Sequence, residues 1–143
     1  MPISYRIVHE KKIVVARGYG VFTPADVSDY QHEVWSAPDV AGYDELVDMT
    51  HVSEVSLPSA QKIRELASIA ARMDEPSAPS RFAIVAPGDL AFGLGRMFQV
   101  YREADARSSK KVGVFRSLDQ ALVFLSLSEP PPLPPVPAPP GKM

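Results

Sequence analysis

Three histidines are the first residues in this chain that could bind a metal or transfer a proton. His9, His32 and His51 are separated by 23 and 19 residues, and none has a second histidine or a suitable acid four residues further on. The His-Glu pairs at 9–10 and 32–33 do not continue into the His-Glu-x-x-His pattern that zinc hydrolases use. We therefore predict surface histidines and no zinc site.

Four acids gather around one short apolar segment of the chain. Asp44, Glu45 and Asp48 lie within or beside it, and Glu54 follows. Carboxylate oxygens are the ligands that Mg²⁺ prefers, but only where they converge on one point in space. We expect solvated acids at a strand end; a magnesium site, or an enzyme that uses carboxylates around Asp48, is the alternative.

Nucleophiles and cofactor motifs are missing from the sequence. The chain has no cysteine, which excludes disulfides, thiolate metal sites and thiol nucleophiles, and no serine stands in a Gly-x-Ser-x-Gly elbow. The segment from Gly88 to Arg96 is rich in glycine but lacks both the Lys-Ser/Thr of a phosphate loop and the third glycine of a dinucleotide fingerprint. We predict no catalytic residue and no cofactor, and attribute Gly93 and Gly95 to close helix packing.

The overall composition narrows the classes of function further. The 143 residues are 45% hydrophobic and 22% charged, with a formal net charge of -2. That balance supplies no broad positive field, so we expect no nucleic-acid partner. The start of the chain lacks the pattern of a secretory signal, and the longest apolar run, Ala121–Leu125, is far shorter than the roughly 20 residues that span a bilayer. We expect a cytoplasmic protein without an integral membrane segment.

Strands are expected where apolar residues alternate with polar ones or form short unbroken runs. The alternation begins at Ile3, and after a charged turn the run from Ile13 to Ala16 completes a hairpin. The unbroken run from Phe82 to Ala86 is typical of a strand that is covered on both faces, and we place it at the centre of the sheet. The strands are predicted near residues 3–7, 13–16, 46–49, 82–86 and 112–115.

Helices are expected where a capping residue precedes a stripe of apolar residues. Thr23 is followed by a proline and, three residues on, by Asp26, and Ser117 with Gln120 forms a capping box. We predict helices near 24–36, 58–73, 89–107 and 117–125, with residues 90, 94, 97, 98 and 101 of the third helix facing inward.

This order of elements predicts an α/β layered domain over residues 1–128. The mostly parallel central sheet has about five strands, one of them an antiparallel hairpin strand, and about four helices form the crossovers. Ligands of such sheets bind beyond the carboxyl ends of the strands. Three segments are expected there, Thr50–Ser59, Pro87–Arg96 and Arg116–Asp119.

The chain changes composition after Ser128, and residues 129–143 form a proline-rich C-terminal tail. Eight of these fifteen residues are proline, against seven in the preceding 128. Such a run is predicted to extend as polyproline II. We interpret it as a solvated tail; a docking ligand with PxxP spacing at Pro131–Pro134 and Pro134–Pro137 is the alternative.

Four residues are candidates for contact with a partner. Ser56 and Ser59 flank the start of the second helix, where a serine caps the helix and where a phosphate would change the surface sharply. Phe92 and Arg96 lie off the inward stripe of the third helix. We predict that Phe92 faces outward, either as a contact or as an ordinary exposed apolar residue.

Three segments together resemble the SpoIIAA-like proteins, relatives of the STAS domain of anti-sigma-factor antagonists. They are LVDMTHVSEVSLPSAQKI, RFAIVAPGDLAFGLGRMFQVYREA and KVGVFRSLDQALVFL, and the likeness covers roughly residues 3–126. In the antagonists a kinase partner phosphorylates a serine that opens the second helix. Here that turn reads Ser56-Leu57-Pro58-Ser59, without the aspartate and glycine of the family, so the resemblance implies only the location. The same fold is similar to lipid carriers of the SEC14 type.

Two functions follow from these observations. The leading hypothesis is a non-enzymatic, STAS-like regulatory module that binds a protein partner or a second copy of itself through Ser56, Ser59, Phe92 and Arg96. The alternative is a carrier or sensor of a small apolar or amphipathic ligand, lined by Met73, Met97, Phe92 and Phe98. A closed apolar cavity would favour the carrier, and a flat or convex surface would favour the protein-binding module.

Overall fold

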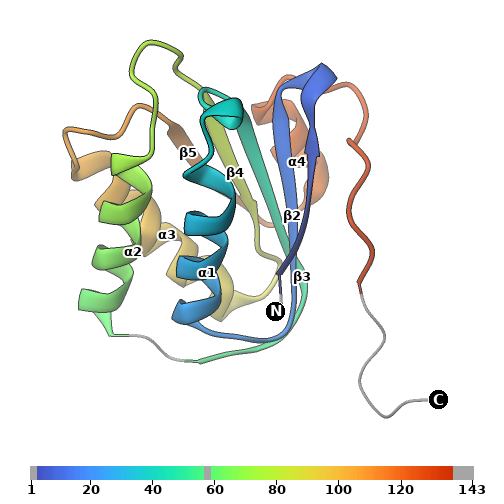
Figure 1. Cartoon of the computed structure of the whole chain (residues 1–143). Helices are drawn as coiled ribbons and strands as arrows, with labels where there is room; N and C mark the ends of the chain where they lie inside the picture. The colour runs from blue at the N-terminus through green and yellow to red at the C-terminus, as the bar shows by residue number, and fades with distance from the viewer. Residues whose placement is uncertain (1–2, 57–58, 137–143) are drawn as a thin grey trace.

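A five-stranded sheet in the order β1-β2-β3-β4-β5 forms the middle layer of the molecule (Figure 1). The computed structural model describes residues 3–56 and 59–136. Strand β1 is antiparallel to β2, and the other neighbours are parallel, as predicted. The middle strand is β3, so the prediction that residues 82–86 occupy the centre is wrong. The strands are β1 Ile3–Val8, β2 Ile13–Phe22, β3 Asp44–Val55, β4 Arg81–Val85 and β5 Lys111–Phe115.

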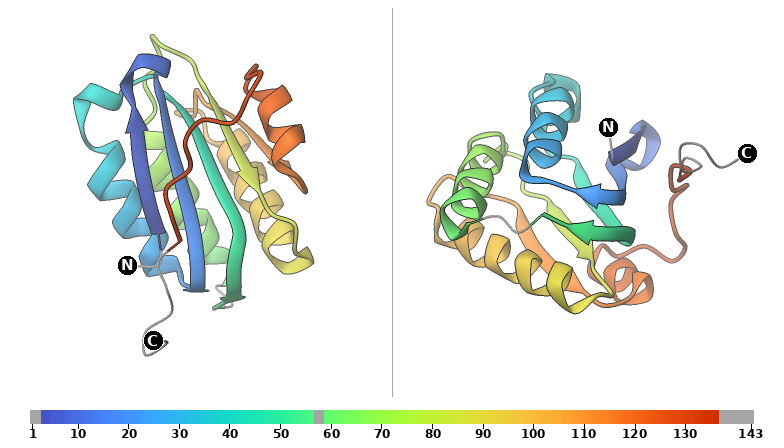
Figure 2. Two further views of the ribbon diagram at one scale, coloured as in Figure 1. Left: turned by 90° about the vertical axis from the view of Figure 1, so that its right-hand side faces the viewer. Right: turned by 90° about the horizontal axis from the view of Figure 1, so that it is seen from below.

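The two faces of the sheet are covered differently. Helices α1, α2 and α3 lie on one face and α4 on the other (Figures 1 and 2). Because the crossovers are parallel, α1, α2 and α3 all begin at the carboxyl edge of the strands, as expected from the element order. The helices are α1 Pro24–Tyr30, α2 Ala60–Arg72, α3 Asp89–Ala104 and α4 Leu118–Phe124, and the short helical turns are η1 His9–Lys11, η2 Gln31–Trp35 and η3 Pro38–Val40.

The predicted caps start three of the helices. The Thr23 side chain accepts a hydrogen bond from Asp26 N while the Asp26 carboxylate accepts one from Thr23 N, a reciprocal pair that satisfies two donors at the start of α1. Ser59 accepts from Lys62 N and Ser117 from Gln120 N, both at 3.1–3.3 Å. Local hydrogen bonding thus sets where each helix leaves the carboxyl edge. Pro58, expected inside the second helix, lies outside the described residues.

Strands β2 and β3 are longer than expected. Residues 50–55, expected in a loop, pair with the second half of β2, which ends at Phe22. Gly18 and Gly20 interrupt the apolar pattern of that half of the strand, and the backbone has a reason for a glycine at both positions. A Cβ at Gly18 would lie 3.0 Å from Phe22 and 3.1 Å from Val52, and Gly20 has φ +65° beside a register shift. The two long strands project beyond β4, whose pairing with β3 ends at Asp48.

The tail crosses the face of the sheet that α4 leaves bare (Figure 2). Arg17 Nη1 donates to Pro134 O at 3.1 Å and Ser4 Oγ donates to Pro135 O at 3.2 Å, while Leu133 packs against the apolar cluster beneath α4. Pro131 and Pro134 are buried, three residues apart, which is the period of polyproline II. A solvated tail was therefore the wrong expectation for residues 131–136, because Arg17 and Ser4 supply donors that the prolines lack. Pro137, the end of the second PxxP, lies outside the described residues.

The part of the chain that the structure describes contains no helix that is both long and apolar enough to cross a membrane.

Candidate functional site

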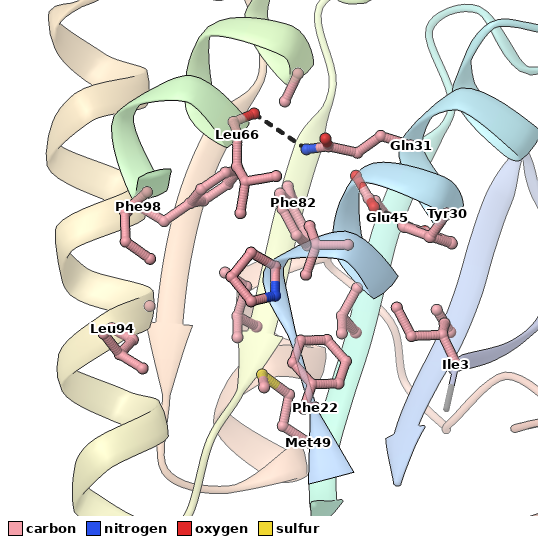
Figure 3. A pocket seen from close by; sticks show the side chains of 18 of the residues that line it. Ile3, Phe22, Tyr30, Gln31, Glu45, Met49, Leu66, Phe82, Leu94 and Phe98 are labelled. Carbon is pink, nitrogen blue, oxygen red and sulfur yellow. Dashed lines mark hydrogen bonds between the residues drawn. The ribbon is translucent and has the colours of Figure 1, made fainter. Parts of the chain in front are cut away.

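A cavity of about 140 Å³ lies between the sheet and helices α1, α2 and α3 (Figure 3). The sheet contributes alternate residues of its strands to one wall, and each helix contributes the residues that face the sheet. Its apolar lining comprises Ile3, Ala16, Phe22, Val27, Val47, Met49, Val55, Ile63, Leu66, Ala70, Met73, Phe82, Ile84, Ala91, Leu94, Gly95 and Phe98.

The helical walls follow from residue spacing. On α3 the lining residues are 91, 94, 95, 98 and 102, a stripe at intervals of three and four that turns one side of the helix toward the sheet. Gly95 lets that helix come close, because a Cβ there would lie 3.0 Å from Val114 Cγ1 on β5. Packing thus explains Gly95, as predicted, although the partner is the sheet. For Gly93 the prediction is wrong, since no atom would lie within 4 Å of its Cβ.

One end of the cavity reaches the carboxyl edge of the sheet. Ser56 lines it there and is exposed, and Thr23 and Pro24 line the same end from the start of α1. Ser56 N donates to Phe22 O at 2.9 Å, which joins the ends of β3 and β2 at this point. Ser56 therefore stands at the mouth of the cavity.

The opposite end of the cavity is buried and polar, and Glu45 is at its centre. Glu45 is 5% exposed and accepts hydrogen bonds from Tyr30 Oη at 2.7 Å and from Trp35 Nε1 at 3.1 Å. Lys110 Nζ lies 3.5 Å from the other carboxylate oxygen and 3.2 Å from the centre of the Trp35 ring. Two segments, residues 30–35 and the loop at Lys110, thus converge on one carboxylate, and Lys110 balances its charge.

Burial shifts the pKa values of two groups in this cluster. The pKa of Tyr30 is raised well above its usual value, first because the phenol is buried and second because the negative charge of Glu45 opposes its ionisation. The pKa of Lys110 is lowered by burial, and the charges of Glu45 and Asp74 partly oppose that shift. Both groups are held in place as structural partners of Glu45.

A second buried pair closes the wall between α2 and α3. Arg102 Nη2 donates to both carboxylate oxygens of Asp74 at 2.7 Å, and Arg102 is 1% exposed. Asp74 also accepts from Ser109 N at 2.9 Å and from Lys110 N at 3.0 Å. The carboxylate therefore anchors the loop that carries Lys110 into the cavity.

Gln31 is the remaining polar side chain at this end. It is 5% exposed, and its Nε2 donates to Leu66 O on α2 at 3.1 Å (Figure 3). Its Oε1 is buried and has no hydrogen-bond partner among the described residues. Burying an amide oxygen without a donor costs free energy, which the hydrogen bond from Nε2 to Leu66 offsets only in part.

The structure distributes the predicted site residues over two places. Met73 and Phe98 line the cavity, as does Ser56, whereas Met97 and Phe92 do not. Ser59 caps α2 at the carboxyl edge, and Arg96 is exposed on α3. Met97 misses the cavity because it lies one residue, or about 100° of helix, away from the lining stripe of α3.

Phe92 does not face outward as expected. It is half-buried and packs against the core beneath α3, and the Arg116 guanidinium lies 4.1 Å from the centre of its ring. Arg116 also donates to Asp89 Oδ1 at 2.6 Å. The side chain that leaves the predicted stripe is instead Leu90, which is 48% exposed. Phe92 thus packs between the core and the Arg116 side chain at the first turn of α3.

The predicted acids do not converge. Alternation along β3 places Glu45 on the cavity face and buried Asp48 on the opposite face, where it lies 3.5 Å from Arg17. Asp44 accepts from Arg81 N, and Glu54 is exposed. His9, His32 and His51 are all exposed, and the described residues contain no group of three potential metal ligands. The magnesium alternative thus has no site in the described ranges.

Sequence reasoning missed Gln31, Lys110 and Arg102. A buried charge cannot be distinguished from a solvated one by spacing alone, and these three residues are brought together by tertiary contacts. One signal was available for Glu45, because an acid inside an otherwise apolar strand must be exposed or must find a partner.

The fold is SpoIIAA-like: residues 3–56 and 59–136 form a five-stranded mixed sheet with one antiparallel pair, and four α-helices. A solved structure that is similar is an uncharacterized protein of the DUF3478 family, with a SpoIIAA-like fold, from Shewanella loihica PV-4. It shares 20% sequence identity with a TM-score of 0.52, over 86% of this chain and 93% of that one. At this identity the likeness establishes the fold alone. Comparison of the sequence with family models and with curated proteins found no match.

Proposed function

We propose that this protein binds a small, largely apolar molecule in the cavity and acts as its carrier or sensor. The observation that carries the proposal is the cavity itself, about 140 Å³ with a lining that is apolar along most of its length. An apolar cavity of roughly 150 Å³ holds a benzene ring. An occupant would gain the contacts with apolar walls that empty space lacks.

The position of the cavity supports binding rather than a packing defect. It begins at the carboxyl edge of the sheet, where ligands of α/β folds bind, and ends at the polar cluster around Glu45. The SpoIIAA-like fold supports the scaffold of this proposal only, because a fold by itself does not indicate an activity. A ring-sized ligand would touch apolar walls on β3, α2 and α3.

Toluene is a direct probe of this proposal. We expect it to bind with a measurable Kd in a calorimetric or NMR titration and to raise the thermal midpoint, because it fills apolar space without needing a polar partner. Ala70→Phe places a ring inside the cavity and should abolish binding. Ala60→Phe, on the exposed start of the same helix, is the matched control and should bind as the wild type does. Toluene that fails to bind the wild type would overturn the proposal.

A second candidate function is protein binding at the carboxyl edge, as part of a regulatory module. The observation that favours it is a pair of exposed apolar side chains, Val21 at 53% and Leu90 at 48%, on the rim that also carries Ser56 and Ser59. We propose a protein partner or a second copy of the chain as the occupant. Joint substitution of the exposed Val21, Ser56, Leu90 and Arg96 should abolish a partner's binding, or the concentration dependence of the sedimentation coefficient, if this surface is used; Ser59 and Phe92 are left intact because they cap α2 and pack against the core.

A further inference from the structure

Residues 131–136 of the tail lie against the sheet with a period of three residues (Figure 2). Pro131 and Pro134 are buried, whereas Pro132 and Pro135, which follow each of them, are exposed. A polyproline II helix has three residues per turn, so one edge of such a helix faces the sheet along its whole length. The contact therefore depends on the shape of a polyproline II segment.

Two donors on neighbouring strands bond the backbone of the tail and not its side chains. Ser4 and Arg17 are opposite each other in the antiparallel pairing of β1 with β2, so they lie on the same face of the sheet. Ser4 Oγ donates to Pro135 O at 3.2 Å, and Arg17 Nη1 donates to Pro134 O at 3.1 Å. Proline has no N–H, so its carbonyl oxygen is the polar group that a receptor can bond. These two bonds suit any segment that presents consecutive carbonyls at this place.

Asp48 orients the Arg17 side chain independently of the tail. It is the partner of Arg17 in the parallel pairing of β2 with β3, and its Oδ2 lies 3.5 Å from Nη2, whereas the tail is bonded by Nη1. The other carboxylate oxygen accepts from Thr50 N at 3.0 Å and from Thr50 Oγ1. Strand β3 thus fixes the carboxylate, and the carboxylate leaves one end of the guanidinium for a carbonyl in the groove.

The apolar part of the contact is equally simple. Leu133 packs against a cluster that contains Val8 and Ile13 of the first hairpin and Leu125 after α4. Together with the two buried prolines, this leucine defines the segment that fits the groove as Pro-x-Leu-Pro. Neither the apolar contact nor the bonds to carbonyl oxygens distinguish this chain's own tail from a segment of the same form on another protein.

The tail has the advantage of its tether. Helix α4 ends at Phe124 and Pro131 is already buried in the groove, so the connection is short. A short tether gives the tail an effective concentration in the millimolar range, and the tail therefore holds the groove even if a free segment of the same sequence binds weakly. A competing segment has to exceed this effective concentration or bind more tightly.

We propose that this face of β1 and β2 is a docking site for a proline-rich segment of another protein, with the form Pro-x-Leu-Pro in the polyproline II conformation, and that the chain's own tail is the occupant which that segment displaces. The site lies on the opposite side of the sheet from the cavity, so the proposal does not depend on the proposed function.

A synthetic peptide of residues 129–136, titrated into the isotope-labelled full-length chain and followed by NMR, tests the proposal. Leu133→Gly together with Pro134→Gly should release the tail, because it removes the apolar contact and one buried proline. We expect the peptide to bind this variant about tenfold more tightly than the wild type, where the tethered tail competes. The shifted amide signals should be those near Ser4 and Arg17. A peptide with Pro131→Gly and Pro134→Gly is the matched control and should not bind.

A third substitution in the released variant tests the groove itself. Arg17→Met removes the charged donor and should weaken peptide binding about tenfold. Arg96→Met removes an exposed guanidinium from α3, on the other face of the sheet, and should leave binding unchanged. Cooperative urea unfolding shows that each variant is folded, and Ser4→Ala, which removes the other donor and should also weaken binding, replaces Arg17→Met if that variant does not fold.

Three results would overturn the proposal. They are equal affinity of the wild type and the released variant, no binding by a released variant that unfolds cooperatively, and undiminished binding after the groove donor is removed. None of them bears on toluene binding, whose absence would overturn the proposed function of the cavity and leave this docking site standing.

Discussion

Arg102 and Asp74 join the last turn of α3 to the end of α2 through one guanidinium nitrogen, Nη2, that lies 2.7 Å from both carboxylate oxygens. The side chains are 2% and 4% exposed. The same carboxylate accepts hydrogen bonds from the backbone N–H groups of Ser109 and Lys110. The pair therefore sets the spacing of α2 and α3 and also the position of the loop that carries Lys110.

Arg102→Met should therefore reduce the free energy of unfolding by about 3–5 kcal/mol, because it leaves the Asp74 carboxylate buried without its cation. Urea unfolding followed by circular dichroism measures this change. Arg107→Met removes the guanidinium of a solvent-exposed ion pair with Asp105 and serves as the control, with an unfolding midpoint close to that of the wild type. Equal effects of the two substitutions would contradict the role given to Asp74.

Tyr30 should make the protein sensitive to alkali. Its pKa is raised in the folded state, so above its ordinary value of 10.0 the unfolded chain loses a proton that the folded protein retains. Stability from this group is then fully present below pH 10.0 and falls as the pH rises further. The lowered pKa of Lys110 acts in the opposite direction but is present in wild type and variant alike.

Tyr30→Phe isolates the contribution of the phenol. It should be about 1–2 kcal/mol less stable at neutral pH, since Glu45 loses its shortest hydrogen bond. Its stability should also fall less steeply than that of the wild type as the pH is raised above 10.0. Urea titrations across this range measure both effects. Parallel pH profiles for the two proteins would show that Tyr30 does not carry the alkaline sensitivity.

The tail should contribute to stability through Leu133. Leu133→Ala removes apolar contact with the cluster beneath α4 and should cost about 1–2 kcal/mol. Pro132, the preceding residue, is exposed, so Pro132→Ala is the control and should leave the unfolding midpoint close to that of the wild type. Chemical denaturation of the full chain checks the pair. No loss of stability in Leu133→Ala would mean that residues 131–136 contribute little to the fold.

Two glycines of α3 should respond in opposite ways to alanine. Gly93→Ala should stabilise the protein by about 0.5–1 kcal/mol, because the added methyl group meets nothing within 4 Å and alanine favours a helix. Gly95→Ala should gain less or lose stability, because its Cβ would press on Val114 Cγ1 at 3.0 Å. Thermal unfolding distinguishes the two, and a larger gain at Gly95 would mean that α3 can move away from the sheet.

The sequence predicted those features of the fold that depend on neighbouring residues. The caps at Thr23, Ser59 and Ser117 need only a residue and the one three positions later, and all three are present. The parallel order of the strands follows from their alternation with helices. The full length of β2 was missed because Gly18 and Gly20 interrupt its apolar pattern; Gly18 allows a close approach and Gly20 lies beside a bulge.

The candidate site was less predictable, because it depends on distant contacts. Met73 and Phe98 line the cavity, since a helical stripe predicts which side faces the sheet; that they contact a ligand stays a prediction. The stripe did not distinguish Met97 from Phe98, which a small rotation of the helix separates. The orphan oxygen of Gln31 depends on Leu66, 35 residues away, and no local pattern contains that information.

The mouth at Ser56 and the buried carboxylate of Glu45 lie at opposite ends of the cavity, with mostly apolar wall between them. A guest that enters from the mouth has to give up its water of hydration against that apolar wall, so desolvation opposes entry of any polar group. Exchange should consequently be slow for a given affinity, with long residence times even for weak guests. Such slow release suits delivery over a distance better than rapid reporting of a changing concentration.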